Sequence, residues 1–525
     1  MAPQRICVLG NTACAWETAN RLGRAGMEVV LATADEAQDP RDGGNRAGQS
    51  PPVQTLSGAR LTACSGQIGQ FDLVFACRGD SVRQTVAAVV LAESDERCPS
   101  EALPGLRLAA NVMPISAFLN AGCRPPAGAA PWKQVAFLNG LQAESHPAMS
   151  GSIMRTALRL QAELAVPCCV LTRNLKVAGE GLEALSREAR SAGVQFFKFT
   201  ASGPTLLQEQ DGSVRLQFVD DPTGKTFLLA PDLVVVDETV RPSALAVELG
   251  QVLGLESDPL GFPQGDNVHR LPVATNRRGI VVAGPARAVG TDAAVEASNA
   301  VIEVLGALAA LGAGDRSTAA RIETGSCIRC LTCLRVCPYR AVALDGRPQV
   351  LPDACERCGL CAAECPREAI RIAGLERADL RARIAAATES PADGPRIVAF
   401  ACRRSAGPAL REAAVGLGPR AAALNLVEVP CAGSLAPEIV LSAFRQGADG
   451  VLVLACHPDN CHSRHGNQLA RRRMDLAASF LAGCGAGTGR LVFRTLASNM
   501  PAEAASLVAE FHATLAGVKP QKELS

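Results

Sequence analysis

Two short stretches decide the fold of the middle of the chain. Residues 327–338 read C-I-R-C-L-T-C-L-R-V-C-P, and residues 355–366 read C-E-R-C-G-L-C-A-A-E-C-P. Each has the spacing C-x2-C-x2-C-x3-C-P, in which three thiolates bind one cubic [4Fe–4S] cluster and the fourth reaches the neighbouring cluster. The Pro after the last cysteine fixes φ and removes a backbone donor where the chain turns away. The repeat therefore predicts two cubic clusters with crossed ligands.

The predicted ligands form two sets of four. Cluster I would use Cys327, Cys330, Cys333 and Cys365, and cluster II would use Cys355, Cys358, Cys361 and Cys337. Zinc or free core thiols are the alternatives, but zinc takes four ligands in two pairs and not two tandem quartets. Residues 320–373 resemble the bacterial two-cluster ferredoxin. The resemblance implies an α+β ferredoxin domain over about residues 318–375.

Length and charge limit the classes of function. The chain has 525 residues, which suggests three or four domains at roughly 150 residues each. Its 52 Lys and Arg against 51 Asp and Glu give a net charge of +1, so a nucleic acid is not the expected partner. Aromatic residues make up only 3%, which also argues against base-stacking surfaces.

The cysteine content points to metal or redox chemistry. The chain contains 21 Cys, and its start, MAPQRICVLG, has no signal-peptide pattern. No apolar run approaches 18 residues, so we expect no membrane span. A long cytoplasmic protein with this many thiols usually holds metal or carries electrons. We therefore expect a cytoplasmic redox protein.

The first region begins with the pattern of a dinucleotide-binding fold. An apolar strand at residues 5–9 is followed by a turn, a helix at 16–24 and a second strand at 26–31. The G-x-G-x-x-G fingerprint would place Gly10, Thr12 and Ala15 at its glycine positions. Thr12 departs from it, since the second glycine lets the backbone approach the pyrophosphate. The residues therefore predict the fold and leave FAD binding open.

A second nucleotide-like lobe is predicted over about residues 131–240, within a domain spanning 1–315. Apolar strands at 135–138, 168–171, 194–199 and 233–237 alternate with helices at 152–164 and 181–192. A late strand at 279–284 then leads into a helix, where flavin phosphates or rings bind in two-domain flavoproteins. The cofactor candidates here are Gly284, Thr291, Asp292 and Ala293. A plain strand–helix corner is the alternative.

Residues 168–196, together with this order of domains, resemble the flavoprotein A subunit of heterodisulfide reductase. The resemblance covers about residues 1–375 and implies a double Rossmann-like scaffold ahead of the ferredoxin. Members of that family carry extra cysteines for a further cluster. Cys123, Cys168 and Cys169 are candidates for remnants of that set, but its full complement is absent. We expect these three to be core thiols.

The third region predicts a parallel α/β domain after a helix and linker at 376–395. Apolar strands at 396–402, 425–431 and 450–456 each end in a cysteine, and a helix at 437–446 separates the last two. Strands joined by helices are usually parallel, so their carboxyl ends share one edge. Four thiolates would converge there and suit a [2Fe–2S] cluster or zinc: Cys402, Cys431, Cys456 and Cys461.

Residues 447–462 and 466–468 resemble the delta subunit of methyl-viologen-reducing hydrogenase. The resemblance covers about residues 395–500 and implies a [2Fe–2S] domain over 396–515. That family has a further cysteine shortly after the first, where this chain has Arg403-Arg-Ser405. Four candidate ligands remain, which is the number that one [2Fe–2S] cluster needs.

The combined pattern predicts an electron-transfer subunit of an oxidoreductase, with no catalytic residue of its own. The domain order is similar to that of the B subunits of the quinone-interacting membrane-bound oxidoreductase complex. The resemblances imply partners of the hydrogenase, formate dehydrogenase, heterodisulfide reductase or quinone oxidoreductase type. Two alternatives stay open: a scaffold or redox sensor with a degenerate flavin fold, and a zinc-binding interaction protein.

Overall fold

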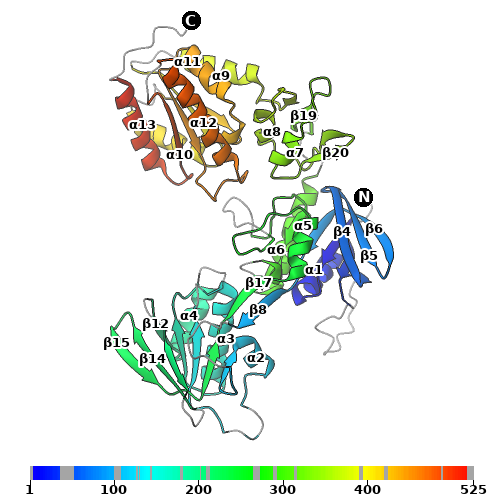
Figure 1. The fold of residues 1–525 in the computed structure, drawn as a ribbon, viewed down its shortest axis with the longest axis vertical. Helices are drawn as coiled ribbons and strands as arrows, with labels where there is room; N and C mark the ends of the chain where they lie inside the picture. Colours follow the sequence, from blue (N-terminus) through cyan, green and yellow to red (C-terminus); the bar gives the residue numbers. More distant parts are fainter. Residues whose placement is uncertain are drawn as a thin grey trace.

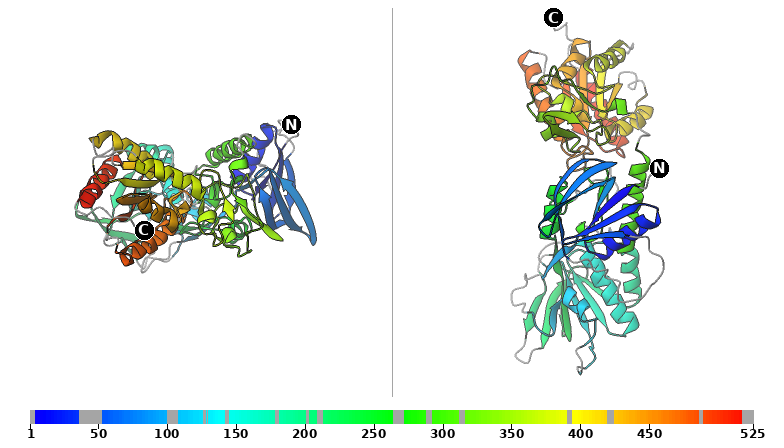
Figure 2. Two further views of the ribbon diagram at one scale, coloured as in Figure 1. Left: turned by 90° about the horizontal axis from the view of Figure 1, so that it is seen from above. Right: turned by 90° about the vertical axis from the view of Figure 1, so that its right-hand side faces the viewer.

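The fold is elongated, with its parts stacked along the long axis (Figures 1 and 2). The second nucleotide-like lobe lies at one end, the first Rossmann-like domain in the middle, and the ferredoxin and C-terminal domains at the other end. The computed structural model describes residues 4–35, 53–99, 108–125, 128, 130–141, 145–177, 181–200, 203–208, 213–263, 272–287, 292–311, 316–389, 394–418, 424–485 and 489–516.

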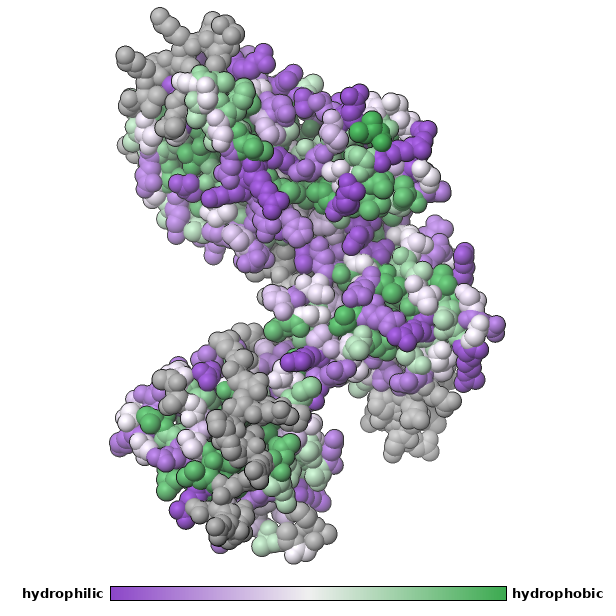
Figure 3. Space-filling view, viewed as in Figure 1, coloured by the Kyte–Doolittle hydropathy of each residue, from purple (hydrophilic) through white to green (hydrophobic). Residues whose placement is uncertain are grey.

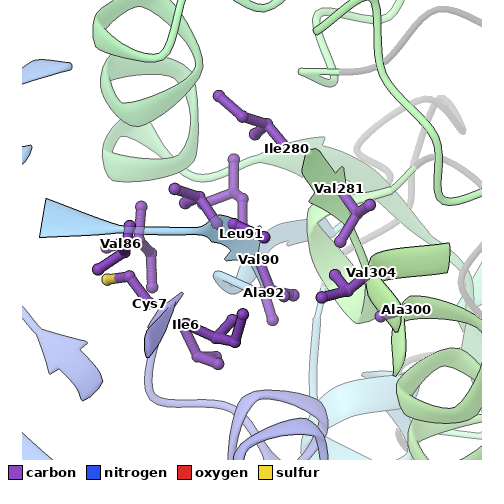
Figure 4. Close-up of a cluster of buried hydrophobic side chains, with 14 of the residues drawn as sticks. Ile6, Cys7, Val86, Val90, Leu91, Ala92, Ile280, Val281, Ala300 and Val304 are labelled. Atoms are coloured by element: carbon purple, nitrogen blue, oxygen red, sulfur yellow. The ribbon is translucent and has the colours of Figure 1, made fainter. Parts of the chain in front are cut away.

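The first domain is a parallel sheet in the order β18-β7-β1-β2-β3. Its strands are β1 (Arg5–Leu9), β2 (Glu28–Thr33), β3 (Val53–Ser57), β7 (Ala88–Leu91) and β18 (Ile280–Val282). Helices α1 (Ala13–Arg24) and α6 (Ala293–Ala309) pack together beside it. Apolar side chains of β1, β7, β18 and α6 form the core (Figure 4). The predicted dinucleotide-type fold is confirmed.

An antiparallel sheet that the sequence patterns did not predict lies between β3 and β7. It consists of β4 (Ala59–Gln67), β5 (Gln70–Cys77) and β6 (Asp80–Val86). Alternating side chains such as Leu61, Phe71 and Phe75 point into the first domain's core. This sheet therefore belongs to the first domain.

The second lobe starts earlier than residue 131. Its sheet has the order β12-β11-β10-β16-β9, and β9 (Val112–Pro114) pairs in parallel with β16 (Leu233–Val236). The other strands are β10 (Val135–Asn139), β11 (Cys168–Thr172) and β12 (Gln195–Lys198), covered by α2 (Ile115–Asn120), α3 (Pro147–Glu163) and α4 (Leu182–Ser191). The predicted boundary was wrong because β9 is too short to show a strand pattern in the sequence.

Smaller elements complete the two lobes. An antiparallel sheet of β13 (Thr205–Gln208), β14 (Val214–Asp220) and β15 (Lys225–Leu229) covers part of the second lobe. A two-stranded ribbon of β8 (Asp95–Pro99) and β17 (Glu238–Pro242) lies where the chain passes between the lobes, and α5 (Ala244–Val252) follows it. The three-residue turns η1 (Gly284–Ala286) and η2 (Arg316–Thr318) flank α6.

The ferredoxin domain is built from two small antiparallel strand pairs and two short helices. Strand β19 (Arg321–Ile322) pairs with β22 (Ile370–Arg371), and β20 (Val342–Asp345) pairs with β21 (Arg347–Val350). Helices α7 (Thr332–Val336) and α8 (Leu360–Ala363) each carry part of one cysteine motif and contact each other. This agrees with the predicted α+β ferredoxin arrangement.

The C-terminal domain is a parallel sheet in the order β24-β23-β25-β26. The strands are β23 (Ile397–Cys402), β24 (Leu424–Val429), β25 (Gly450–Ala455) and β26 (Leu491–Thr495). They are covered by α10 (Ala406–Gly416), α11 (Pro437–Arg445), α12 (Gly466–Gly483) and α13 (Pro501–Ala516), with the turn η4 (Ala432–Ser434) after β24. The predicted parallel α/β domain is confirmed.

The segment predicted as a helix and linker at 376–395 contains a helix that is part of the C-terminal domain. Helix α9 (Arg377–Glu389) packs against α11 and β24. Its Leu380 and Ile384 are 2% and 0% exposed and belong to the core formed by β23, β24 and β25. The sequence did not predict that this Ala-rich helix packs into the core, because only two of its large apolar residues face the core.

Polar and apolar residues are interspersed on the face shown in Figure 3. Among the described helices, none is both long and apolar enough to cross a membrane.

Candidate iron–sulfur centres and dinucleotide site

The four cysteines predicted for cluster I line one small, almost entirely apolar cavity in the ferredoxin domain. The loop between them is tightly wound, since Arg329 and Leu331 both have positive φ, at 56° and 60°. Cys330 is exposed, and hydrogen bonds with Thr332 lower the pKa of its thiol. The fourth predicted ligand, Cys365, accepts a hydrogen bond from the amide of Ala369 at 3.3 Å. The fold thus gathers one three-cysteine turn and the distant fourth cysteine.

The four cysteines predicted for cluster II line a second cavity of the same kind. Cys337 accepts a hydrogen bond from the amide of Ala341 at 3.4 Å, which repeats the Cys365–Ala369 contact. Burial raises the pKa of Cys337 and of Cys358, the latter to about 12. A buried thiol of this kind loses its proton only when a cation compensates the charge. The chain thus brings together the two sets of cysteines that the predicted crossed arrangement requires.

The four C-terminal cysteines converge at the carboxyl edge of the parallel sheet. Cys402 ends β23, Cys431 precedes η4, Cys456 follows β25, and Cys461 returns from the next loop. All four are at most 3% exposed and pack together with Leu360 of the ferredoxin domain. The sulfur atoms of Cys402 and Cys456 are 3.5 Å apart. We refer to these four cysteines as the C-terminal tetrad.

The thiols of the tetrad influence one another strongly. Hydrogen bonds from Cys431 and Cys456 lower the pKa of Cys461, and the bond with Cys456 lowers that of Cys402 to about 7. The pKa values of Cys431 and Cys456 are raised by the same bonds and by burial. Within the described residues, no group of three or more His, Cys, Asp or Glu side chains is arranged to hold a single metal ion. Protonation of each thiol of the tetrad depends on at least two of the others.

Gly466, the first residue of α12, is required for the close packing of the tetrad. A Cβ atom at this position would collide with the sulfur of Cys431 and lie 3.5 Å from that of Cys461. The next residue, Asn467, donates hydrogen bonds to the carbonyl oxygens of Cys456 and His457 at 3.1 and 2.8 Å. The start of α12 therefore holds the loop that carries two of the four cysteines.

The nearby histidines are engaged elsewhere. His457 contacts the sulfur of Met500 at 3.3 Å through Nε2 and the hydroxyl of Thr495 at 3.0 Å through Nδ1. His462 lies against Arg404 and the ring of Tyr339. His465 lies 4.0 Å from the carboxylate of Glu256. These side chains shape the loop around the tetrad.

The ferredoxin domain is docked directly onto the tetrad. Leu360 is 1% exposed and lies between the cluster II cavity and the tetrad, and Cys358 packs against the tetrad as well. The hydroxyl of Tyr339 contacts Ser463 at 3.1 Å and donates to the carbonyl of His462 at 3.2 Å. Arg473 of α12 also forms an ion pair with Glu364 of the ferredoxin domain. No sequence pattern signals the contacts of Tyr339 and Arg473, because they join residues 109 to 124 positions apart.

The turn after β1 has only some of the features of a phosphate-binding turn in dinucleotide-binding folds. Gly10 has a φ of 129°, and a Cβ there would collide with the carbonyl oxygen of Ala92. Thr12 accepts a hydrogen bond from the amide of Ala15 at 3.2 Å and donates to the carbonyl of Ala92 at 2.7 Å. Its hydroxyl thus takes one of the amides that a phosphate would use at a helix N-terminus.

The other dinucleotide candidates meet at a cavity of about 210 Å³ between the two lobes. Thr12, Gly284, Asp292 and Ala293 line this cavity, and Thr291 lies outside the described residues. The buried carboxylate of Glu296 accepts from the amide of Gly284 at 3.3 Å and pairs with Arg287 at 2.6 Å.

The end of β2 also departs from the usual pattern. Thr33 stands where an acidic residue would bind ribose hydroxyls, and its own hydroxyl donates to the carbonyl of Asp35 at 2.7 Å. With Thr12 in place of the second glycine, two of the usual binding groups are missing. The residues therefore do not fit the standard way of holding FAD, and FAD binding stays a prediction.

The three cysteines considered as remnants of a further cluster do not form one group. Cys168 and Cys169 are neighbours on β11, so their side chains point to opposite faces of the sheet and enter different cores. Cys123 shares a core with Cys168 only. Burial raises the pKa of both strand thiols to about 12. They lie in the structure as core thiols.

Comparisons with known proteins agree with this architecture. Residues 397–518 match the family described as methyl-viologen-reducing hydrogenase, delta subunit. Over 99 residues, the chain is 34% identical to the D-type iron–sulfur subunit of the F420-non-reducing hydrogenase of Archaeoglobus profundus, covering 19% of this chain and 72% of that one. Through this part, the chain belongs to the family of hydrogenase delta subunits. Its delta-type domain, residues 397–518, is fused to a ferredoxin domain, since residues 326–372 match the 4Fe-4S dicluster family.

The chain is also similar to the A subunit of heterodisulfide reductase. It is 29% identical over 327 residues to the A subunit of the ferredoxin:CoB-CoM heterodisulfide reductase of Methanosarcina mazei, covering 62% of this chain and 41% of that protein. The chain thus spans about two fifths of the length of these relatives. Among solved structures, the thioredoxin reductase of T. acidophilum is 13% identical with a TM-score of 0.37, covering 59% of this chain and 100% of that one.

Proposed function

We propose that this chain is an electron-transfer subunit of a multi-subunit oxidoreductase. The observation that carries the proposal is the packing of Cys358, a predicted cluster II ligand, against the C-terminal tetrad. Two groups of redox-active ligands are thereby buried next to each other across a domain boundary. The similarity to the A subunit of heterodisulfide reductase and to the hydrogenase delta subunit supports the same function.

The eight ferredoxin cysteines would hold two [4Fe–4S] clusters, and the tetrad would hold one [2Fe–2S] cluster. When bound, such clusters supply one-electron carriers whose potentials depend on charge, hydrogen bonds and solvent exposure. The chain contributes exclusion of water, through Leu360 and Tyr339, and amide hydrogen bonds to the sulfurs of Cys337 and Cys365. Exposed Cys330 marks the edge of the ferredoxin domain that a partner can approach.

We propose other subunits of a redox complex as partners, of the hydrogenase, formate dehydrogenase, heterodisulfide reductase or quinone oxidoreductase type. The delta-type domain is the proposed docking point for the electron donor. A cytoplasmic location is part of the same proposal.

A scaffold role is the second candidate for the first domain. The positions of Thr12 and Thr33 favour it, because their hydroxyl groups are hydrogen-bonded within the chain where a dinucleotide would bind. The two roles can coexist in one chain, since the clusters lie in other domains.

The test is iron and acid-labile sulfide analysis of anaerobically purified protein, combined with electron paramagnetic resonance of the reduced protein. We expect about ten iron atoms per chain and little zinc. Cys461→Ser should remove the [2Fe–2S] signal, whereas Cys484→Ser, which changes an exposed cysteine outside the tetrad, should leave it unchanged. Zinc with little iron would overturn the proposal.

Flavin extraction from the same sample tests the first domain. About one flavin per chain would contradict the scaffold role, and its absence would support that role. Neither result affects the cluster assignment.

A further inference from the structure

A cavity of about 350 Å³ lies at the junction of the ferredoxin and delta-type domains. It is lined from both sides: Arg357 and Tyr339 come from the ferredoxin domain, and Arg403, Arg404 and His462 from the delta-type domain. Its volume is within the range of small-molecule sites. It adjoins the cluster II cavity and shares five lining residues with it: Tyr339, Glu356, Arg357, Cys358 and Ile372. It shares no lining residue with the cluster I cavity.

Positive charge dominates this cavity. Four guanidinium groups line it, those of Arg357, Arg383, Arg403 and Arg404, against the single carboxylate of Glu356. A guanidinium nitrogen of Arg404 is 3.8 Å from the carboxylate of Glu356, so this carboxylate forms an ion pair with one of the four arginines. The carboxylate of Asp379, on the same helix, also acts on the charge of Arg383, but Asp379 does not line the cavity.

Neutral partners hold two of these arginines in place. Arg357 donates to the hydroxyl of Thr318 at 2.7 Å, and Arg383 donates to the carbonyl of Glu428 at 2.6 Å. These contacts fix the guanidinium groups without neutralising them. Burial and the charge of Arg403 lower the pKa of Arg383, so the two cations repel each other. Arg403 is exposed, and its side chain has no hydrogen-bond or ion-pair partner among the described residues.

The rest of the lining is suited to an organic group. Ile372, Leu375 and Pro430 supply apolar surface, and Tyr339 supplies an aromatic ring. Planar guanidinium groups bind phosphate and carboxylate oxygens in pairs, which gives both affinity and orientation. A ligand that combines a phosphate with a small organic body would match both parts of the cavity.

We propose that this interdomain cavity binds a small organic phosphate of mononucleotide size, carrying at least two negative charges. The bound anion would bridge the two domains, because its phosphate contacts arginines from both. It would therefore stabilise their docked arrangement. This inference does not depend on electron transfer, so it can fail while the proposed function holds.

The test is calorimetric titration of the anaerobically purified full chain, with its iron content verified, using ADP, inorganic pyrophosphate and adenosine. We expect ADP to bind more tightly than pyrophosphate and adenosine to bind weakest, with affinity falling as salt rises. Arg403→Gln should weaken ADP binding by about tenfold or more, since it removes a charged hydrogen-bond donor. Arg357→Gln, on the other wall, should weaken it similarly.

The matched control is Arg381→Gln, which removes an exposed arginine from the same helix as Arg383 but outside the cavity. It should leave ADP binding unchanged. The proposal is overturned if the wild-type chain binds neither ADP nor pyrophosphate at low salt. It is also overturned if the control weakens binding as much as the two cavity variants do. A shift of cluster potentials in Arg403→Gln without ADP binding to the wild type would assign these arginines to cluster charge compensation instead.

Discussion

At the scale of single residues, Gly466 is the position where the smallest change should have the largest effect on the tetrad. Gly466→Ala adds a methyl group that would collide with the sulfur of Cys431. We expect loss of the proposed [2Fe–2S] cluster, or about two of the ten iron atoms proposed, with the proposed ferredoxin clusters retained. Iron analysis and electron paramagnetic resonance would measure this.

Gly483→Ala, near the other end of α12, is the matched control. A Cβ there meets no atom within 4 Å. The control should keep all its iron and gain a little helix stability, about 0.5–1 kcal/mol. Full iron content in Gly466→Ala would contradict the predicted crowding.

Asp237, just after β16, should make the stability of the second lobe depend on pH. Burial raises its pKa from 3.8 to about 6, although the amide of Gly140 donates to it at 2.6 Å. Below about pH 3 the carboxyl group is largely neutral in both the folded and unfolded states. As pH rises to about 6, the unfolded state ionises first, so folding loses about 3 kcal/mol.

Asp237→Asn removes this titration. The difference in free energy of unfolding between wild type and variant should therefore change by about 3 kcal/mol between pH 3 and pH 7, to the disadvantage of the wild type. Urea unfolding at several pH values would measure it. A difference that stays constant with pH would show that Asp237 titrates normally.

At the scale of secondary-structure elements, α9 should behave as part of the C-terminal core. Ile384→Ala removes a fully buried side chain that packs between α11 and the sheet. We expect a loss of about 2–5 kcal/mol from the stability of this domain. Amide hydrogen exchange in β24 and α11 under increasing urea would report it.

Arg381→Ala changes an exposed residue on the same helix and should alter the stability by less than about 0.5 kcal/mol. If Ile384→Ala behaved like this control, the packing of α9 would not contribute to the stability of the C-terminal domain.

At the scale of the whole molecule, the contact between the ferredoxin and delta-type domains rests on Leu360. Leu360→Ala should leave a void between the cluster II cavity and the tetrad and weaken docking by about 2–5 kcal/mol. Increased hydrogen exchange in η4 and α8, with iron content maintained, is the expected result. Leu344→Ala is the control, because Leu344 is 54% exposed on the β20–β21 hairpin. Equal exchange in both variants would mean that Leu360 does not hold the domains together.

The sequence by itself determined which cysteines are brought together, because cluster motifs are local. Three cysteines separated by two residues each favour a tight turn whatever the rest of the fold is. The Cys-Pro ending marks the fourth cysteine, which is predicted to reach the neighbouring cluster. The convergence of Cys402, Cys431 and Cys456 was also predictable, since parallel strands place their carboxyl ends at one edge. The apolar strand patterns likewise revealed the Rossmann-like sheets.

Tertiary structure alone decided how these local parts meet. Packing placed Leu360 and Cys358 against the tetrad, made α9 part of a core, and added β9 to the second lobe. It also gathered four arginines around one cavity and committed the hydroxyl of Thr12 to Ala92 and Ala15. Such contacts depend on complementary shape and charge between residues far apart in the chain, so they cannot be predicted from the spacing of residues in the sequence.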